Sequence, residues 1–292
     1  MIIIGENLSI MSTKIRGALN QKDPGPVREM ALAMAGAGVD LIDINLGPAR
    51  KEGAELMTWV VKTVQEVVDL PLSLDTTNVE AMEAGLKVHK GRALINSVSA
   101  RPERMQALMP LAKKYDAAFI GLTLGIEGLP RDANERGLLA TQLVAEASHY
   151  GISEEDIWVD PVALPVNTQQ MQIQGCTDFF IMLSELGNPW KTICGLSNTS
   201  NGAPSRLRGI LNRTYMIILR HYGIYSVIAN AFDLELMAIA RGRRSELESL
   251  IYEVIDSEDI DISKLSGEEL DYVKTARVLL GRTIYSDSWL EL

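Results

Sequence analysis

The segment LPLSLDTTNVEAMEAGLKVH, residues Leu70–His89, holds the pattern that decides the fold. It begins with the short apolar-rich run Leu70–Asp75, which predicts a strand that ends at a carboxylate. Asn78 then stands where a helix N-cap should be, directly before the amphipathic segment Val79–His89. The segment therefore predicts one strand followed by one helix.

This strand–helix unit recurs about eight times along the chain. The candidate strands are Ile2–Glu6, Leu41–Leu46, Leu70–Asp75, Arg92–Ser97, Ala118–Thr123, Ile157–Pro161, Thr192–Asn198 and Ser226–Ala231. Most of these runs are continuously apolar, as expected for strands buried on both faces of a parallel sheet. Segments such as Glu55–Val68 and Glu135–Tyr150 predict helices, the second capped by Asp132. Glycines stand where three helices should end, at Gly38, Gly151 and Gly223.

Eight such units in roughly 250 residues predict a (β/α)8 TIM barrel, with residues 1–292 forming a single domain. The alternative is a doubly wound open sheet, which normally carries a glycine-rich phosphate loop after its first strand. The corresponding stretch here, Gly5-Glu6-Asn7-Leu8-Ser9, is not such a loop. A further helix is expected over Gly267–Leu280, as a C-terminal helical extension packed on the barrel.

The composition narrows the classes of function. The hydrophobic fraction of 47% is enough for a buried core, and no apolar run reaches the roughly 18 residues of a membrane span. The formal net charge of −10 argues against nucleic-acid binding, which needs a basic patch. Cys176 and Cys194 form no CxxC pair and suit a reducing compartment. Because the N-terminus also lacks the features of a signal peptide, we expect a cytoplasmic protein.

Carboxylates and carboxamides gather at the ends of the predicted strands. In a TIM barrel these ends form the mouth at which the chemistry takes place. The side chains concerned are Glu6, Asn7, Asp43, Asn45, Asp75, Asn96, Asp160, Asn198, Asn230 and Asp233. We therefore expect them to converge on one mouth of the barrel.

Other reactive groups are rare at these ends. All three histidines fall near predicted helix C-termini, where a cation suits the helix dipole: His89, His149 and His221. No His, Cys and carboxylate trio marks a zinc site, and no lysine ends a strand as Schiff-base chemistry would require. Asp43, Asp75 and Asp160 could bind magnesium. The asparagines around them and the lack of phosphate-binding cations favour a site without metal.

A ring of Asp and Asn suits a neutral, planar heterocycle with amide and amidine edges. A carboxylate accepts two parallel N–H bonds from a 2-aminopyrimidinone edge, and each carboxamide adds a donor and an acceptor. Pterins present such an edge. Asp and Asn also cap helices and satisfy loop backbone, but that role accounts for one such residue better than for six or seven at successive strand ends.

Five ordered motifs resemble those of the methyltetrahydrofolate:corrinoid methyltransferases. This family includes the enzyme that serves the corrinoid/iron–sulfur protein and the folate domain of cobalamin-dependent methionine synthase. The motifs are Asn45-Leu46-Gly47-Pro48, Leu72-Ser73-Leu74-Asp75-Thr76-Thr77-Asn78, Leu94-Ile95-Asn96-Ser97, Val159-Asp160-Pro161 and Gly195-Leu196-Ser197-Asn198-Thr199-Ser200. The resemblance runs from Ile3 to about Ser288. It implies a TIM barrel, usually a homodimer.

The resemblance also implies roles for individual residues. Asp75, Asn96 and Asp160 would hold the pterin ring, and Asn198 would be the catalytic residue that hydrogen-bonds the methyl-bearing ring nitrogen. Further candidates for the site are Glu6, Asp43, Asn45, Ser197, Asn201 and Asn230. Such enzymes move a methyl group between (methyl)tetrahydrofolate and the cobalt of a corrinoid, a cobalamin-type cofactor carried by a separate corrinoid protein.

Two segments depart from the family pattern. The family often has GERxN at its first strand, where this chain has Gly5-Glu6-Asn7-Leu8-Ser9. Three residues after Asn198, the enzymes that serve the corrinoid/iron–sulfur protein carry Gln, whereas this chain has Asn201 followed by Gly202-Ala203-Pro204. These differences suggest a different corrinoid protein, for example that of an O-demethylase or methylamine-type system.

Other functions stay open at this point. A dihydropteroate synthase-like enzyme uses the same fold and pterin edge but needs cations for a pyrophosphate leaving group. The candidates for that role are Arg50-Lys51 and Arg206 with Arg208. The chain could also be a non-catalytic pterin-binding protein or a magnesium-dependent lyase.

Overall fold

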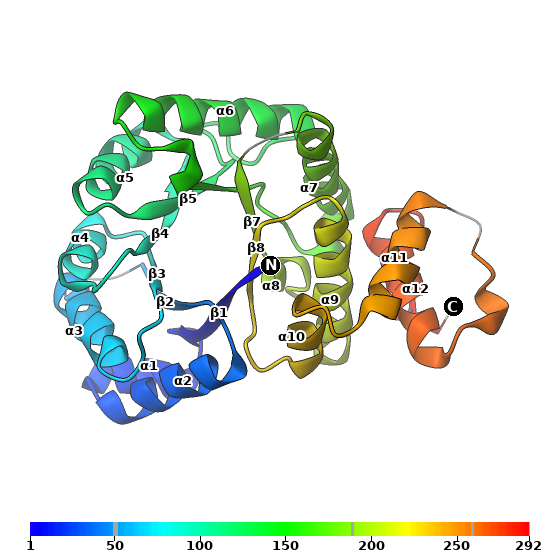
Figure 1. Ribbon diagram of the computed structural model, residues 1–292, viewed down its shortest axis with the longest axis horizontal. Coiled ribbons are helices and arrows are strands. Elements are labelled where there is room, and N and C mark those ends of the chain that lie inside the picture. Colours follow the sequence, from blue (N-terminus) through cyan, green and yellow to red (C-terminus); the bar gives the residue numbers. More distant parts are fainter. Residues whose placement is uncertain (49–51, 188–189, 258–259, 292) are drawn as a thin grey trace.

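The computed structural model describes residues 1–48, 52–187, 190–257 and 260–291. Eight parallel strands form a closed barrel in sequence order, and β8 pairs with β1 to complete it. Helices surround this barrel (Figure 1). The protein is therefore a single-domain (β/α)8 TIM barrel, which confirms the predicted fold class.

Strands and helices alternate along most of the chain. The strands are β1 (Ile2–Ser9), β2 (Leu41–Gly47), β3 (Leu72–Thr76), β4 (Leu94–Ser99), β5 (Ala118–Leu122), β6 (Ile157–Asp160), β7 (Lys191–Gly195) and β8 (Ser226–Ala229). The helices in the described ranges are α1 (Thr13–Gln21), α2 (Pro24–Ala37), α3 (Gly53–Gln65), α4 (Val79–Val88), α5 (Pro102–Lys114), α6 (Ala133–His149), α7 (Val166–Glu185), α8 (Leu196–Thr199), α9 (Ser205–His221), α10 (Leu234–Ala240), α11 (Ser245–Asp256) and α12 (Gly267–Leu279). Two short 3-10 helices are η1 (Glu154–Asp156) and η2 (Ile262–Lys264).

Local capping signals set several helix bounds where the sequence predicts them. The Asn78 side chain accepts a hydrogen bond from the Ala81 amide over 2.9 Å at the start of α4. Asp132 accepts one from the Glu135 amide over 2.9 Å at the start of α6. At the predicted helix ends φ is positive, a conformation that favours glycine: Gly38 (86°), Gly151 (68°) and Gly223 (80°). The three histidines also lie at the helix C-termini predicted for them.

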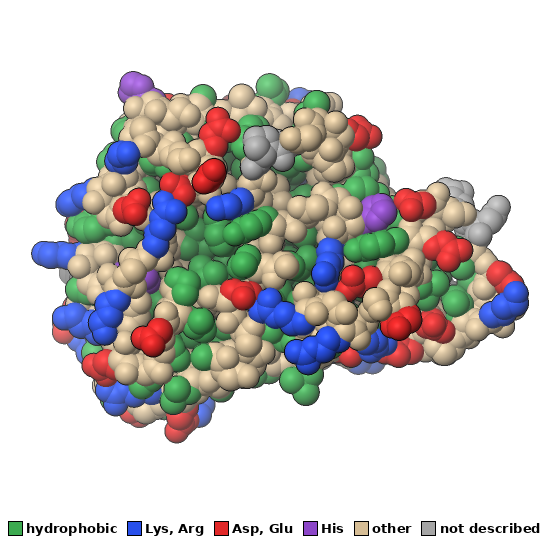
Figure 2. All heavy atoms as spheres, in the orientation of Figure 1, with side chains coloured by type: hydrophobic (Ala, Val, Ile, Leu, Met, Phe, Trp, Pro, Cys, Tyr) green, Lys and Arg blue, Asp and Glu red, His purple; other side chains and the backbone are tan. Residues whose placement is uncertain are grey.

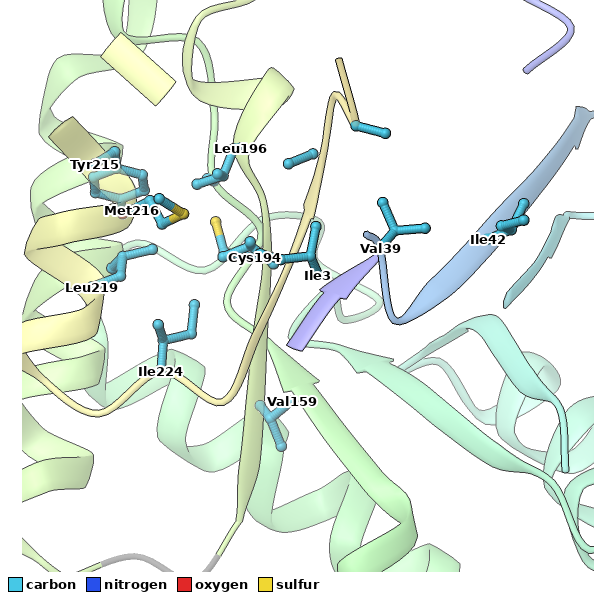
Figure 3. Packing of buried hydrophobic residues seen from close by; sticks show 14 of the residues in the cluster. Ile3, Val39, Ile42, Val159, Cys194, Leu196, Tyr215, Met216, Leu219 and Ile224 are labelled. Carbon is cyan, nitrogen blue, oxygen red and sulfur yellow. The ribbon is translucent and has the colours of Figure 1, made fainter. Parts of the chain in front are cut away.

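The main core lies between the barrel wall and the helices. Cys194 of β7, for example, lies beside Met216 and Leu219 of α9 (Figure 3). Alternate strand positions point the other way, into the barrel. They form a separate buried cluster made of Ile4, Leu94, Ala118, Ile120, Trp158 and Ile193. The strands are thus buried on both faces, as their continuous apolar runs predict.

Helices α11 and α12 form the C-terminal extension, which stands at one side of the barrel in Figure 1. α12 begins with a capping box between Ser266 and Glu269. Gln170 of α7 donates to the backbone oxygen of Thr283 over 2.7 Å, which fastens the segment after α12 to the barrel helices. The predicted helix over Gly267–Leu280 is confirmed to within one residue.

Strand seven ends earlier than predicted. β7 stops at Gly195, and Leu196–Thr199 form the short helix α8, so the prediction that Asn198 ends a strand is wrong. The apolar run extends over this turn because Leu196 is itself buried in the helix. Asn198 consequently stands on the first turn after the barrel wall.

Other polar residues predicted at strand ends lie inside strands. β1 continues to Ser9, with a register shift between Gly5 and Leu8, so Glu6 does not end it. β4 starts and ends two residues later than predicted, and Asn96 is its third residue. These strands extend because buried side chains such as Leu8 and Val98 lie beyond the polar residues.

Charged side chains of both signs are interspersed on the face shown in Figure 2, where hydrophobic side chains gather over the centre of the barrel. A smaller cavity of about 410 Å³ is lined by strand-start residues that include Ile2, Leu41 and Leu94. Within the described ranges, no helix has the length and apolar character needed to cross a membrane.

Candidate active site

A polar cavity of about 960 Å³ opens where the strands end. All ten residues proposed for the site from the sequence line it: Glu6, Asp43, Asn45, Asp75, Asn96, Asp160, Ser197, Asn198, Asn201 and Asn230. The barrel topology accounts for this convergence, because all eight parallel strands point toward the same mouth. The predicted convergence is confirmed, while the chemical role of each residue stays a prediction.

The register between β2, β3 and β4 places three of these residues in one row. Asn45 pairs with Asp75, and Asp75 pairs with Asn96. The Asn45 amide nitrogen donates to Asp75 Oδ2, and the Asn45 carbonyl oxygen accepts from the Gly47 amide over 3.0 Å. Asn45 is therefore occupied by its neighbours and orients Asp75, whose other oxygen is left for a ligand.

Beneath the row of Asn45, Asp75 and Asn96 lies a second layer, formed by Asp43 and Ser73. Oδ1 of Asp43 accepts hydrogen bonds from the Ser73 hydroxyl over 2.6 Å and from the Asn96 amide over 3.1 Å. Asp43 is 3% exposed, and its burial raises its pKa. Burial also raises the pKa of Asp75, and the nearby Asp43 carboxylate raises it further. The mouth thus holds two carboxyl groups that resist being ionised together.

Asp160 is the last residue of β6 and faces the cavity from the side opposite Asp75. Its Oδ1 accepts a hydrogen bond from the Val162 amide over 2.7 Å. Burial raises its pKa to about 7, while this hydrogen bond and the charge of Arg136 act in the opposite direction. Asp160 therefore changes its charge near neutral pH.

Glu6 and Ser197 link the first strand to the turn that carries Asn198. The Ser197 hydroxyl donates to Glu6. Burial raises the pKa of Glu6, and this bond and the charge of Arg208 offset only part of that rise. Asn198 is exposed in the mouth, and its amide nitrogen lies 3.2 Å from the position that a Cβ on Gly195 would take. The absence of a side chain at position 195 thus leaves room for the Asn198 amide.

Several lining residues have roles within the fold. Asn7 donates to Asn230 over 2.7 Å, and Asn230 also accepts from the Phe232 amide, which ties strand one to the turn after β8. Asp233 caps α10 and forms an ion pair with Arg213 over 2.8 Å. These contacts leave Asn230 and Asp233 less available to a ligand than the sequence suggests.

One face of α9 forms a wall of the cavity that was not predicted from the sequence. The residues are Ser205, Arg208, Gly209 and Asn212, of which the sequence pointed to Arg208 as a candidate cation for a pyrophosphate group. Their spacing is that of one helix face, which is a usable signal, but it does not say that this face meets the mouth. Oδ1 of Asn212 is buried without a hydrogen-bond partner in the described structure, so it is an available acceptor on this wall.

The cations considered for a pyrophosphate group are not all in this cavity. Arg208 lines it, whereas Arg206 donates to the Asp287 backbone oxygen over 3.2 Å. Arg50 and Lys51 lie outside the described residues. Among the residues that are described, no group of three or more His, Cys, Asp or Glu side chains is arranged to hold a metal ion.

A closed (β/α)8 barrel with a large polar cavity at the strand ends defines the class of barrel enzymes that bind their substrates in that mouth. The chain belongs to the pterin binding enzyme family, whose sequence pattern matches residues 12–216. The matched range contains Asp75, Asn96, Asp160 and Asn198. Membership of this family agrees with the resemblance read from the sequence motifs.

Curated relatives share its sequence over most of its length. The methylcorrinoid:tetrahydrofolate methyltransferase of Eubacterium limosum is 28% identical over 239 residues, which are 81% of this chain and 88% of that protein. The methionine synthases of Mycobacterium leprae and Mycobacterium tuberculosis are each 26% identical over 265 residues. These matches cover 87% of this chain but 22% of each synthase, so the chain resembles one part of those larger proteins.

Solved structures with a similar fold include dihydropteroate synthases. The enzyme of Thermus thermophilus has a TM-score of 0.62 and 19% identity, with 84% of this chain and 93% of that chain covered. The Yersinia pestis enzyme in a sulfonamide drug complex has a TM-score of 0.63 and 18% identity, covering 84% and 94% of the two chains. At this level of identity the likeness concerns the fold.

Proposed function

We propose that this protein is a methyltransferase that moves a methyl group between tetrahydrofolate and the cobalt of a corrinoid carried by a separate corrinoid protein. The observation that carries the proposal is the convergence of Asp75, Asn96 and Asp160 with Asn198 in one polar cavity. The name of the Eubacterium limosum relative supports the same reaction. The pterin is the substrate that these side chains would hold.

The cavity suits recognition of the pterin ring by its polar edge. Asp75 and Asp160 each have one carboxylate oxygen held by a protein amide, which leaves the other oxygen for a ligand. When ionised, such carboxylates accept N–H bonds from the 2-amino-pyrimidinone edge. Asn96 offers its carbonyl oxygen and one N–H, because its other N–H already donates to Asp43. This set of groups binds an edge that is rich in N–H donors.

Asn198 would stabilise the charge that develops on the methyl-bearing ring nitrogen during transfer. When the methyl group leaves for cobalt(I), the nitrogen–methyl bond breaks and its electron pair stays on the ring nitrogen, which then takes up a proton. A side-chain donor beside this nitrogen stabilises the developing charge. A carboxamide does not give up its proton at neutral pH, so the proton comes through water or a neighbouring acid.

A spectral assay tests the reaction directly. The protein is mixed with methyltetrahydrofolate and a cobalt(I) corrinoid, and the conversion to methylcobalt(III) is followed by absorbance. Methyl transfer that depends on Asn198 supports the proposal. Tight binding of methyltetrahydrofolate without transfer to any corrinoid would instead favour a non-catalytic pterin-binding protein.

We propose a tetrahydrofolate-methylating component of an O-demethylase-type system, because the segment from Asn201 to Pro204 departs from the enzymes that serve the corrinoid/iron–sulfur protein. Equal rates with that protein and with an O-demethylase corrinoid protein would contradict this setting. We also propose that the protein is cytoplasmic and forms a homodimer, and light scattering of the purified protein checks the homodimer.

Dihydropteroate synthase activity is the second candidate, since Arg208 lines the cavity and synthases of this type share the fold. Incubation with p-aminobenzoate and a pterin pyrophosphate separates the two functions. Formation of dihydropteroate would support this candidate over methyl transfer.

A further inference from the structure

Arg136 is a fully buried cation that the proposed reaction does not use directly. It lies in α6 and is 0% exposed. Its Nε donates to the Pro161 backbone oxygen over 3.0 Å, and its terminal nitrogens donate to the Asp132 backbone oxygen and to Gln172 Oε1 over 3.1 and 2.7 Å. Within the described ranges, no carboxylate forms an ion pair with it. Its charge is therefore compensated by hydrogen bonds to neutral oxygens.

The packing around Arg136 is arranged to admit this side chain. A Cβ on Gly175 of α7 would lie 3.0 Å from a terminal nitrogen of Arg136, which is closer than side chains normally approach. An unpaired buried charge is costly unless hydrogen bonds compensate it. The observed hydrogen bonds provide that compensation, and the glycine opposite the guanidinium leaves the room it needs.

Arg136 contacts the turn that directly follows Asp160, through the backbone oxygen of Pro161. Val162 in this turn has a φ of 62°, a left-handed conformation that is strained for a β-branched residue. The Val162 amide donates to Asp160, while Arg136 holds the neighbouring Pro161 oxygen from behind. Cys176 of α7 lies 3.6 Å from the same Pro161 oxygen. Two helices therefore fix the turn that aims the Asp160 carboxylate.

Arg136 is also a cation whose charge reaches Asp160. Cys176 of α7 and Cys194 of β7 also lie near Asp160, with Tyr215 of α9 next to both cysteines. Asp178 of α7 is a further carboxyl group near Arg136 and Cys176, and burial raises its pKa while Arg136 lowers it. Burial raises the pKa of the two cysteines and of Tyr215, so these three groups are neutral at neutral pH. The charge of Arg136 opposes the effect of burial on Asp160.

We propose that Arg136 is a positioning residue for Asp160, which fixes the Pro161–Val162 turn from outside the barrel and favours the ionised form of the carboxylate. The geometry of the turn and the charge act together, so Asp160 is both aimed and ionised when a ligand arrives. The identity of that ligand rests on the proposed function, whereas the effect on Asp160 does not.

The test is a titration of Asp160 by carboxyl ¹³C NMR in aspartate-labelled protein, with its signal assigned by its loss in Asp160→Asn. Arg136→Gln removes the charge, and Gln172→Glu places a carboxylate against the guanidinium with little change of volume. We expect the Asp160 midpoint to rise by about one pH unit in Arg136→Gln and by less in Gln172→Glu. Arg131→Gln is the matched control, because Arg131 is a cation just before the same helix with 87% of its side chain exposed. It should leave the midpoint unchanged.

Arg136→Lys separates the charge from the hydrogen bonds. It should keep the midpoint near that of the native protein but weaken tetrahydrofolate binding, because one ammonium cannot replace the guanidinium contacts. If Arg136→Gln fails to fold, Gln172→Glu decides the question. An unchanged midpoint in the folded charge variants would overturn the inference. A midpoint that shifts while the native protein binds no tetrahydrofolate would instead remove the proposed function and leave the role of Arg136 intact.

Discussion

The Asn96 side-chain amide donates to Oδ1 of Asp43 over 3.1 Å, and this bond decides what Asn96 presents to the cavity. One N–H of the amide is used by a buried carboxylate, so the carbonyl oxygen and the second N–H are the groups left for a ligand. Ser73 donates to the same Asp43 oxygen, which holds the carboxylate in place. The orientation of Asn96 toward the ligand thus depends on Asp43, which lies beneath it.

Replacing Asp43 with Ala should weaken tetrahydrofolate binding by about tenfold or more. The change leaves the side-chain amide of Asn96 and the buried hydroxyl of Ser73 without their acceptor. An unmet buried group costs about 1–3 kcal/mol, so Asn96 turns to another partner and no longer offers its oxygen to the ligand. Isothermal titration calorimetry of Asp43→Ala measures the loss. Asp43→Asn is the matched control, because it retains an oxygen that can accept both bonds. An equal loss of affinity in both variants would show that the charge of Asp43, not its acceptor, matters.

Replacing Asp160 with Asn should stabilise the fold above neutral pH while weakening ligand binding. The carboxyl pKa is about 7 in the folded protein, against an ordinary value of 3.8. The folded state therefore holds the proton more tightly, and native stability falls as pH rises from about 4 through 7. Asparagine has no such titration and still accepts from the Val162 amide.

Urea unfolding at pH 4 and pH 8 checks this prediction for Asp160. Asp160→Asn should match the native protein at pH 4 and exceed it at pH 8 by an amount on the order of a few kcal/mol. Tetrahydrofolate affinity should fall in the same variant at pH 8, because the carboxylate acceptor is lost. A stability difference that is the same at both pH values would contradict the raised pKa.

Replacing Asn198 with Ala should reduce the rate of methyl transfer by about 10²–10³-fold, the usual cost of losing one donor to developing charge. Binding of methyltetrahydrofolate should change much less, because Asp75, Asn96 and Asp160 hold the ring. Asn198→Asp is the informative partner variant, since it keeps the size and the acceptor but offers no N–H. Stopped-flow absorbance gives the rate, and a parallel loss of affinity in both variants would argue for a binding role.

The sequence predicts which residues meet in the mouth better than how they are connected. Repeated strand–helix units bring Asp75 and Asp160 to one end of the barrel whatever the details of the strands. The pairing of Asn45 with Asp75 depends on the register between β2 and β3, which the apolar pattern does not determine to one residue. For the same reason the ends of β4 and β7 differ from those predicted.

Long-range packing accounts for what the sequence does not reveal. An arginine on an amphipathic helix is expected to be exposed, yet Arg136 is buried because Gly175 of the next helix leaves room for it. The wall formed by α9 likewise depends on how that helix is rotated against the barrel. Neither arrangement has a local signal, since each is set by contacts between separate elements.

Replacing Gly202 with Ala should lower both stability and methyl transfer. Gly202 has a φ of 77°, and an added Cβ would lie 2.8 Å from the Asn167 side-chain nitrogen. The backbone conformation alone costs about 1 kcal/mol for a residue other than glycine, and the contact with Asn167 adds to this cost. Because Gly202 follows Asn201 in the turn after Asn198, its displacement should reach the cavity.

Gly223→Ala separates the two contributions, since Gly223 has a φ of 80° but no atom within 4 Å of the added Cβ. Gly223→Ala should lose only the stability that the positive φ costs a residue other than glycine, and it should keep the native rate of methyl transfer. The double variant Gly202→Ala with Asn167→Ala should regain part of the loss, because the obstructing side chain is gone. Thermal unfolding and the cobalt assay on all three proteins test this prediction. If Gly202→Ala behaves like Gly223→Ala in both measurements, the contact with Asn167 does not shape the turn that carries Asn198.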